Sequence, residues 1–413
     1  MNLILEKIKS DPLKAIMFLW IFILPWDFFN GVMGVFTIIF IILWLILGKS
    51  KGYFSKLKEI FSNKPIIILI LFIMFAYLSL MWSDNQKTAF SELNFYKYYW
   101  VLIPIIYTVF DKEDIKTAFY TLVLSFGIYA IFTLSIFLGF FEIGNSNSLN
   151  PKGILHYAVV TVYMAINTMF AFYFYLKEQD NQKIKYLFLI ISILSFLSLL
   201  VNNGRIAQIS FLGTLFILII YYRQYLFQYK KLFISLSLVF FLAISFLYST
   251  NKLDRYAKGF NELVYSYENK EFIGSWGPRL FMWYVAKDTI PKNLLFGAGV
   301  GDIRDDIIKY VESNPNQLKH HIIGYHNQHL DYLAKFGLFG YLLFLAGIFI
   351  LLKELYLNDK YFFILGLIFF SIVLIDSMGD IILLMKPFNN IYVLVFVLLA
   401  ILVNSKNKQE KIG

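Results

Sequence analysis

Long apolar stretches follow one another along almost the whole chain and constrain its fold more than any other feature. Each stretch is roughly as long as a membrane-spanning helix, about 20 residues, and is apolar on all faces rather than along one stripe. The 413 residues are 59% hydrophobic and only 15% charged. A soluble domain cannot bury so many such segments around one core. The sequence therefore predicts an all-α, polytopic membrane protein whose helices are surrounded by lipid.

About twelve membrane-spanning helices are expected, and they form a single integral membrane domain over residues 1–413. The fourth expected span is short and contains Pro104, which predicts a tilted or kinked helix. No internal repeat is apparent. The expected spans are 13–29, 31–47, 65–82, 97–110, 117–140, 153–176, 185–202, 206–222, 231–249, 335–352, 361–377 and 387–403.

The basic residues of the short loops predict the orientation of these spans. With the N-terminus inside, 21 Lys and Arg residues flank the cytoplasmic ends and five flank the opposite ends. An even number of spans places both termini in the cytoplasm. The large loop 250–328, between spans nine and ten, then faces outward. The net charge of +10 follows mostly from this lysine bias, and some of these lysines are expected to lie near anionic lipid head groups. The charge does not indicate nucleic acid.

The large outer loop is expected to contain helices, because a loop of this length without structure or function of its own is uncommon. Leu280, Trp283 and Tyr284 recur at helical spacing, and Pro291 follows them. This pattern predicts a helix over 279–290. The helix would lie against the membrane surface or the end of the bundle.

Alternating glycines follow this helix, at Gly297, Gly299 and Gly301. Such glycines are typical of a turn, here one that returns the chain to the bundle. They also let a backbone approach a phosphate or a sugar closely, and both interpretations stay open for Gly299. Three nearby carboxylates are interpreted as a solvated face, namely Asp302, Asp305 and Asp306.

Arginine is scarce, which makes its positions informative. Only five of the 37 basic residues are arginine, so this composition prefers lysine wherever any cation serves. Arg205 stands at the outer end of the eighth span, and Arg279 opens the helix of the outer loop. Each guanidinium offers a planar donor fork suited to two phosphate oxygens. The alternative for each is a structural arginine at the membrane interface.

Four of the five histidines lie within ten residues of one another, just before the tenth span: His320, His321, His326 and His329. A histidine with an ordinary pKa of about 6.5 accepts protons at neutral pH, which favours a general base. A structural histidine at the membrane interface is the alternative. A metal site on His326 and His329 would need a third ligand, and none stands at a recognisable spacing.

Two acids stand near the outer end of the eleventh span, at Asp376 and Asp380. Acidic side chains at membrane depth are costly and are usually paired. One of them would orient a catalytic cation, or both would mark a water-exposed helix end. The sequence leaves both interpretations open.

The order of these residues resembles the O-antigen ligase family. His326 and Asn327, then nine residues, then Gly337 and Gly340 match the pattern of that family in full. The wider group includes O-antigen polymerases and bacterial protein O-oligosaccharyltransferases. The resemblance covers roughly 80–403 and is strongest in 200–340. Other matching features are Arg205, Arg279 with Trp283, the turn at Gly297, Gly299 and Gly301, and the stretch WSDNQKTAF that begins at Trp82.

The resemblance implies a GT-C-like, inverting glycosyltransferase that needs no metal or other cofactor. It would work on the periplasmic face of the bacterial inner membrane, among membrane lipids. The implied donor is an undecaprenyl-diphosphate-linked glycan, and the implied acceptor is the lipid A core oligosaccharide. His326 would be the general base, and Arg205 and Arg279 would hold the diphosphate. Further substrate-binding residues would be Tyr325, Asn327, His329 and Gly299.

Three alternatives remain at this stage. An O-antigen polymerase would use the same donor with the same His and Arg chemistry. A protein O-oligosaccharyltransferase is disfavoured by the short C-terminal tail. A polysaccharide or lipid transporter is disfavoured because the polar residues gather at one outer mouth rather than at the bilayer midplane.

Overall fold

A computed structural model describes residues 11–26, 32–224, 254–313 and 324–403, together with two isolated positions, 245 and 248. Within these ranges the chain forms helices, and two isolated bridges are the only β-type pairing. The predicted all-α class is confirmed. His320 and His321 lie outside the described residues, as does the expected span 231–249 apart from those two positions.

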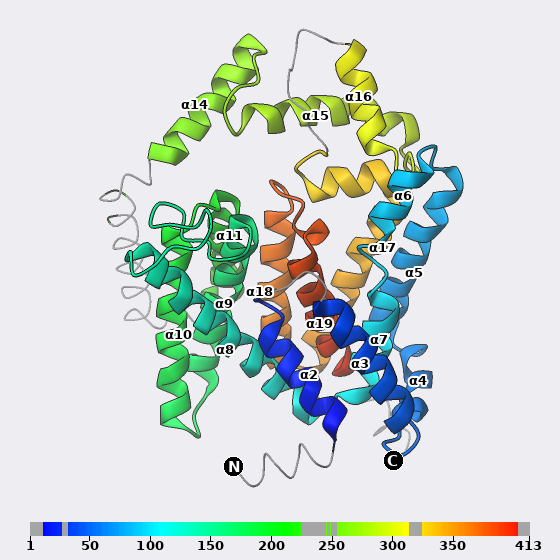
Figure 1. Cartoon of the computed structure of the whole chain (residues 1–413), viewed down its shortest axis with the longest axis vertical. Coiled ribbons are helices and arrows are strands. Elements are labelled where there is room, and N and C mark those ends of the chain that lie inside the picture. The colour runs from blue at the N-terminus through cyan, green and yellow to red at the C-terminus, as the bar shows by residue number, and fades with distance from the viewer. Residues whose placement is uncertain are drawn as a thin grey trace.

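Within the described residues, eleven apolar helices form a bundle (Figure 1). Five bundle segments of this part of the chain are long and apolar enough to cross a membrane: α5 with η1, α8, α9, α10 and α17. The helices are α2 (Pro12–Ile23), α3 (Val32–Leu47), α5 (Lys64–Leu78) extended by η1 (Ser79–Trp82), α7 (Tyr99–Val109), α8 (Lys112–Phe137), α9 (Tyr157–Lys177), α10 (Gln182–Val201), α11 (Arg205–Tyr221), α17 (Gln328–Asn358), α18 (Lys360–Asp376) and α19 (Lys386–Ile401).

Each of these helices coincides with an expected span, apart from its ends. Pro104 lies inside α7, which is only 11 residues long, as the sequence predicts. The largest difference concerns α17, which begins at Gln328 rather than at the expected residue 335. Two short helices were not expected, α4 (Tyr53–Ile60) and α6 (Gln86–Leu93). The total of twelve spans stays a prediction.

Two helices lie at the centre of the bundle, α9 and α19. Nearly every residue of α9 from Ala158 to Phe174 is buried, and so is every residue of α19 from Phe388 to Ala400. Helix α9 packs against α10, α11 and α18, and α19 packs against α7 and α17. A helix that is apolar on all faces is stable at such a position, because neighbouring helices take the place of lipid.

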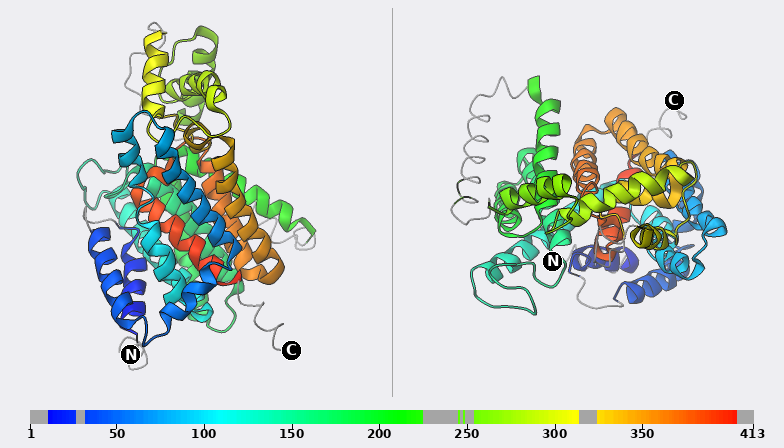
Figure 2. Two further views of the ribbon diagram at one scale, coloured as in Figure 1. Left: turned by 90° about the vertical axis from the view of Figure 1, so that its right-hand side faces the viewer. Right: turned by 90° about the horizontal axis from the view of Figure 1, so that it is seen from above.

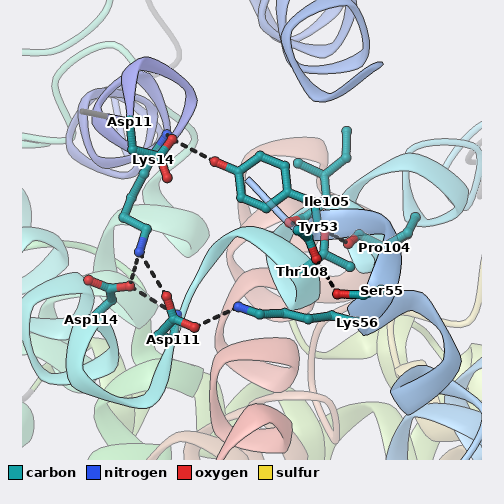
Figure 3. A network of polar contacts seen from close by, with 11 residues as sticks. Asp11, Lys14, Tyr53, Ser55, Lys56, Pro104, Ile105, Thr108, Asp111 and Asp114 are labelled. Carbon is teal, nitrogen blue, oxygen red and sulfur yellow. Dashed lines mark hydrogen bonds and ion pairs between the residues drawn. The ribbon is translucent and has the colours of Figure 1, made fainter. Parts of the chain in front are cut away.

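At the end of the bundle where α2 begins, a charged network joins three segments of the chain (Figure 3). Lys14 contacts Asp111 at 3.0 Å and Asp114 at 2.6 Å, and Lys56 contacts Asp111 at 2.6 Å. Burial would raise the pKa of the Asp111 carboxyl, but Lys56 and Lys14 outweigh that effect and lower it. Two of the lysines that the topology argument assigned to the cytoplasmic side therefore hold helices together.

The opposite end of the bundle carries three further helices (Figures 1 and 2), and it is called the outer end below, after the orientation that the loop charges predict. They are α14 (Asp254–Asn269), α15 (Gly277–Thr289), which continues into η2 (Ile290–Asn293), and α16 (Ile303–Ser313). Helix α15 confirms the helix predicted over 279–290. These three helices form the outer cap. Helices α15 and α16 share a small apolar core that includes Phe281, Val285, Ile307 and Tyr325, and α14 packs against α15.

The predicted solvated face at Asp302 is wrong. Asp302 is only 6% exposed. The two oxygens of its carboxylate accept hydrogen bonds from the backbone N–H groups of Asp84 and Asn85, at 3.0 and 2.8 Å. Asn85 also donates to Asp305 at 2.7 Å. Buried carboxylates need such partners, and these bonds fasten the segment before α6 to the outer cap.

Helix α17 is broken at Gly337, where φ is 61° and ψ is −169°. The glycine-rich loop before α16 inserts at the break and pairs with the backbone groups that the interrupted helix leaves without partners. This loop is therefore a turn that also repairs a helix. Four hydrogen bonds do so: Ala298 N to Ala334 O at 2.8 Å, Gly299 N to Lys335 O at 3.2 Å, Leu338 N to Leu294 O at 2.7 Å and Phe339 N to Leu295 O at 3.1 Å.

Replacing Gly337 by alanine is expected to destabilise the protein by roughly 2–5 kcal/mol, because the new Cβ forces both backbone strain and a clash. That atom would lie 2.4 Å from the carbonyl carbon and oxygen of Leu295. Gly347→Ala is the matched control, since it lies in the same helix and its added methyl would meet nothing closer than 3.7 Å. Thermal unfolding in detergent measures the difference. Equal midpoints for the two variants would contradict the interpretation.

Candidate active site

Arg279 lies in the first turn of α15 and is held by three parts of the outer end. Its Nε donates to the carbonyl of Gly379 at 3.0 Å, and Nη1 donates to the carbonyl of Ser275 at 2.8 Å. Its Nη2 pairs with Asp380 at 3.3 Å. Three of the five guanidinium N–H groups thus fix its plane, which leaves two to bind a ligand. The guanidinium also lies over the Trp276 ring, at 5.7 Å from its centroid.

Arg205, the first residue of α11, reaches the same place from the bundle. Its Nη2 donates to the side-chain oxygen of Ser275 at 2.7 Å, so Ser275 joins both arginines. The Glu262 carboxylate in turn accepts from the backbone N–H and hydroxyl groups of Ser275, at 2.8 and 3.2 Å. Two guanidinium groups that are 74 residues apart in the sequence are therefore held within reach of one serine.

His326 is an exposed residue close to Arg279 and Asp380, whose charges act on its imidazole. The place where Arg205, Arg279 and His326 meet is called the mouth below. Partial desolvation lowers the pKa of His326, and the charge of Arg279 lowers it further, whereas Asp380 raises it. Asp380 is buried, and its pKa is raised by burial against the opposing charges of Arg279 and His326. Of the two interpretations of Asp380, the structure supports the one in which it orients a cation, namely Arg279.

The backbone at His326 is unusual, because its φ of 48° lies in the left-handed region that non-glycine residues seldom adopt. The neighbouring Asn327 fixes this conformation. Its side-chain oxygen caps α17 by accepting from the N–H groups of His329 and Leu330, at 3.0 and 3.1 Å, and its amide donates to the carbonyl of Met378 at 2.9 Å. These bonds make Asn327 a positioning residue for the backbone at His326, and its role in substrate binding stays a prediction.

Three other candidate residues have protein partners that favour structural roles. Both ring nitrogens of His329 are engaged, Nε2 with the carbonyl of Leu374 at 2.8 Å and Nδ1 with the hydroxyl of Tyr341 at 3.0 Å. The Tyr325 hydroxyl contacts Thr289 at 2.8 Å inside the core of the outer cap. Gly299 belongs to the loop that repairs α17.

The structure adds residues that the sequence reasoning missed. His156, the remaining histidine, is the N-cap of α9, and its pKa is lowered by burial but raised by Asp380, which places it in the electrostatic environment of the site. Ser275 and Glu262 carry no sequence motif. In the segment GSWGPR, which surrounds Ser275, only Arg279 stands out in the sequence.

Helix N-termini gather at the outer end beside these side chains. Helices α9, α11 and α17 all begin there, as does α15 in the outer cap (Figure 1). Side chains cap α9 and α17, whereas no side chain caps α11 or α15. The first N–H groups of α11 and α15, and the helix dipoles, make these N-termini favourable for anions. Together with two arginines, they give the mouth a chemistry suited to a phosphate-bearing ligand.

Gly259 in α14 gives a direct test of the Arg205 position. A Cβ at this residue would lie 2.6 Å from Nη1 of Arg205 and 2.8 Å from Nε1 of Trp276. Gly259→Ala is therefore expected to displace the guanidinium and to lower kcat/KM about tenfold, a loss of roughly 1.4 kcal/mol. Stability should hold or rise, since alanine favours a helix by roughly 0.5–1 kcal/mol over glycine.

The control for that variant is Gly34→Ala in α3, where an added methyl group meets nothing within 4 Å. Steady-state kinetics and thermal unfolding would be measured on both variants. Loss of stability without loss of turnover in Gly259→Ala would contradict the proposed contact.

Comparison with known families places these residues in context. Residues 190–345 match the family described as O-Antigen ligase. No curated protein matches the chain. The matched segment runs from α10 into α17 and contains Arg205, Arg279 and His326, in agreement with the region where the sequence resemblance is strongest. The chain is thus a multi-pass membrane protein in which one segment, residues 190–345, is similar to the family described as O-Antigen ligase.

Proposed function

We propose that this protein transfers a glycan from undecaprenyl diphosphate to the lipid A core oligosaccharide on the periplasmic face of the inner membrane. The observation that carries the proposal is the meeting of Arg205, Arg279 and His326 at one outer mouth, linked through Ser275 and Asp380. A transfer of this kind needs positive charge beside the departing diphosphate and a base beside the attacking hydroxyl.

In the proposed reaction, a hydroxyl oxygen of the acceptor attacks the anomeric carbon of the donor from the side opposite the diphosphate. The new carbon–oxygen bond forms as the bond to the diphosphate oxygen breaks, and the configuration at the anomeric carbon inverts. Undecaprenyl diphosphate leaves with the bonding electron pair. His326 accepts the hydroxyl proton as the attack proceeds, and its lowered pKa keeps it neutral and ready to do so near pH 7.

Arg279 and Arg205 would stabilise the negative charge that develops on the departing diphosphate. Because Arg279 is fixed by Gly379, Ser275 and Asp380, its remaining N–H groups point in a set direction before the donor binds. Such preorganised donors stabilise a transition state without the cost of reorienting solvent. No covalent intermediate on the protein is required.

A polymerase or a protein O-oligosaccharyltransferase would use the same donor and the same mouth, with another acceptor. Extracts of a deletion strain would separate the three. Loss of the ligase leaves free lipid-linked polymer, loss of a polymerase leaves single repeat units on the core, and loss of a protein glycosyltransferase removes glycoproteins only.

Reconstitution tests transfer itself against transport. The purified protein would be mixed with lipid-linked glycan and acceptor in detergent, without any ion gradient, and the linked product measured by mass. Product formation supports the enzyme. Movement of the lipid-linked glycan across vesicles, without any linked product, would support a transporter instead.

A further inference from the structure

A groove of about 540 Å³ lies on the outer cap beside α14. One face of α14 forms its wall, through Lys258, Asn261, Glu262 and Tyr265, and Ile273 closes the other side. These positions recur at intervals of three and four residues along α14, so they share one side of the helix. Of the groups that line this groove, only Glu262 also belongs to the site described above, through its bonds to Ser275.

The lining is mixed in character, which restricts what the groove would hold. Lys258 is a donor, Asn261 is both donor and acceptor, and the two carboxylates of the lining, Asp254 and Glu262, are acceptors. Tyr265 is 40% exposed and adds an aromatic surface, and its hydroxyl donates to Glu271 at 2.7 Å, which restrains the ring. Charges of both signs disfavour a hydrocarbon chain and give no continuous basic track for a nucleic acid. Hydroxyl-rich rings with one apolar face fit this set of groups.

The groove is connected to the two arginines through one residue. Glu262 lies on its wall and accepts from Ser275, which in turn accepts from Arg205 through its hydroxyl and from Arg279 through its carbonyl. Gly259, on the adjacent side of α14, faces the Arg205 guanidinium. A ligand whose diphosphate lies at the arginines would therefore extend its next groups toward this groove.

We propose that the groove binds the sugar residues of the lipid-linked donor that follow the diphosphate. This inference rests on the proposed function and deepens it, because it assigns α14 the recognition of the glycan being transferred. The groove would raise the affinity for donors with long glycans over donors with a single sugar. It would thereby favour completed polymers as substrates.

The test compares two donors with purified full-length protein: the lipid-linked polymer, and undecaprenyl diphosphate carrying one N-acetylhexosamine. Tyr265→Ala is expected to raise the KM for the polymer donor about tenfold more than the KM for the single-sugar donor, with kcat little changed for the polymer. Tyr265→Phe keeps the ring and should restore most of the affinity. A kcat loss without this KM difference would overturn the assignment.

Two matched controls lie outside the groove. Tyr267 is on the same helix and is 62% exposed, so Tyr267→Ala removes a comparable ring from the other side of α14. Lys309 lines a second groove of about 460 Å³, at the end of α15 remote from Arg279. Tyr267→Ala and Lys309→Ala should keep the donor preference of the wild type. If either control changes it as much as Tyr265→Ala does, the groove is not the glycan site.

A binding measurement separates this inference from the proposed function. Polymer released from its lipid by mild acid would be titrated against the wild type and Tyr265→Ala, with saturation-transfer NMR as the readout. Binding that Tyr265→Ala abolishes supports the groove, even if no product forms with the lipid A core. Transfer by the wild type together with equal polymer binding by both proteins would overturn the groove and leave the proposed function standing.

Discussion

Replacing His326 by alanine is expected to lower turnover by at least about 10²-fold, because the attacking hydroxyl loses its proton acceptor. The protein should remain folded, since the exposed imidazole makes no hydrogen bond to the described part of the chain. Product formation from lipid-linked glycan and acceptor, at saturating concentrations of both, measures the effect.

His329→Ala is the matched control for this variant. It removes a histidine one helical turn away whose two nitrogens bind Leu374 and Tyr341, so the expected loss is of stability rather than of chemistry. Near-normal turnover of His326→Ala would rule out the assigned base. A larger kinetic defect in His329→Ala than in His326→Ala would also contradict the assignment.

The pH dependence of kcat/KM should follow the environment of His326. A base must be unprotonated to act, so activity falls as the pH drops through the pKa of His326, which lies below the ordinary histidine value. Because Asp380 raises this pKa, Asp380→Asn should move the acid limb of the profile to lower pH. Because Arg279 lowers it, Arg279→Gln should move the limb to higher pH. An acid limb that stays in place in both variants would mean that another group titrates.

Replacing Arg279 by lysine is expected to lower kcat/KM by at least about 10²-fold, although the charge is kept. Lysine has no planar fork, so it cannot hold Gly379, Ser275 and Asp380 while presenting further N–H groups to a diphosphate. Steady-state kinetics with varied donor measures the change, and thermal unfolding reports whether the outer cap stays in place.

Arg304→Lys on α16 is the control, because this arginine is exposed and lies on another helix of the outer cap. Its turnover should match the wild type. Arg205→Lys extends the test to the second arginine, whose contact with Ser275 uses one Nη2 donor. Full activity of both Arg279→Lys and Arg205→Lys would mean that charge alone suffices and that the fork geometry is irrelevant.

The bundle helices could be predicted from the sequence, because the pattern that indicates each of them lies within a single run of residues. A membrane-spanning helix satisfies all its backbone groups internally, so a run of apolar residues is enough to predict it. The break in α17 could not be read in this way. Gly337 continues an apolar run, and its left-handed conformation depends on the loop from Leu294 to Gly299, which is far away in the sequence.

The residues of the site likewise fall into some that the sequence could predict and others that it could not. Arg205, Arg279 and His326 stood out by residue type and order, and the structure brings them to one mouth. Their partners Ser275 and Asp380 depend on tertiary placement, so the sequence could offer only two alternatives for Asp380 and none for Ser275. Asp302 was misread because an acidic residue in a polar loop gives no sign that backbone N–H groups will cover it.

The loop that repairs α17 has a practical consequence for protein engineering. In a chimera, the outer cap of one protein replaces that of a related protein. The exchanged segment must then begin and end outside the part of the chain that folds as one unit. Here four backbone hydrogen bonds join the segment from Leu294 to Gly299 to the two halves of α17. A junction between residues 294 and 339 would therefore take the donors and acceptors of these bonds from different parents. Exchange of 254–358 as one block would keep both partners from the same parent, and with them the support beneath the histidine.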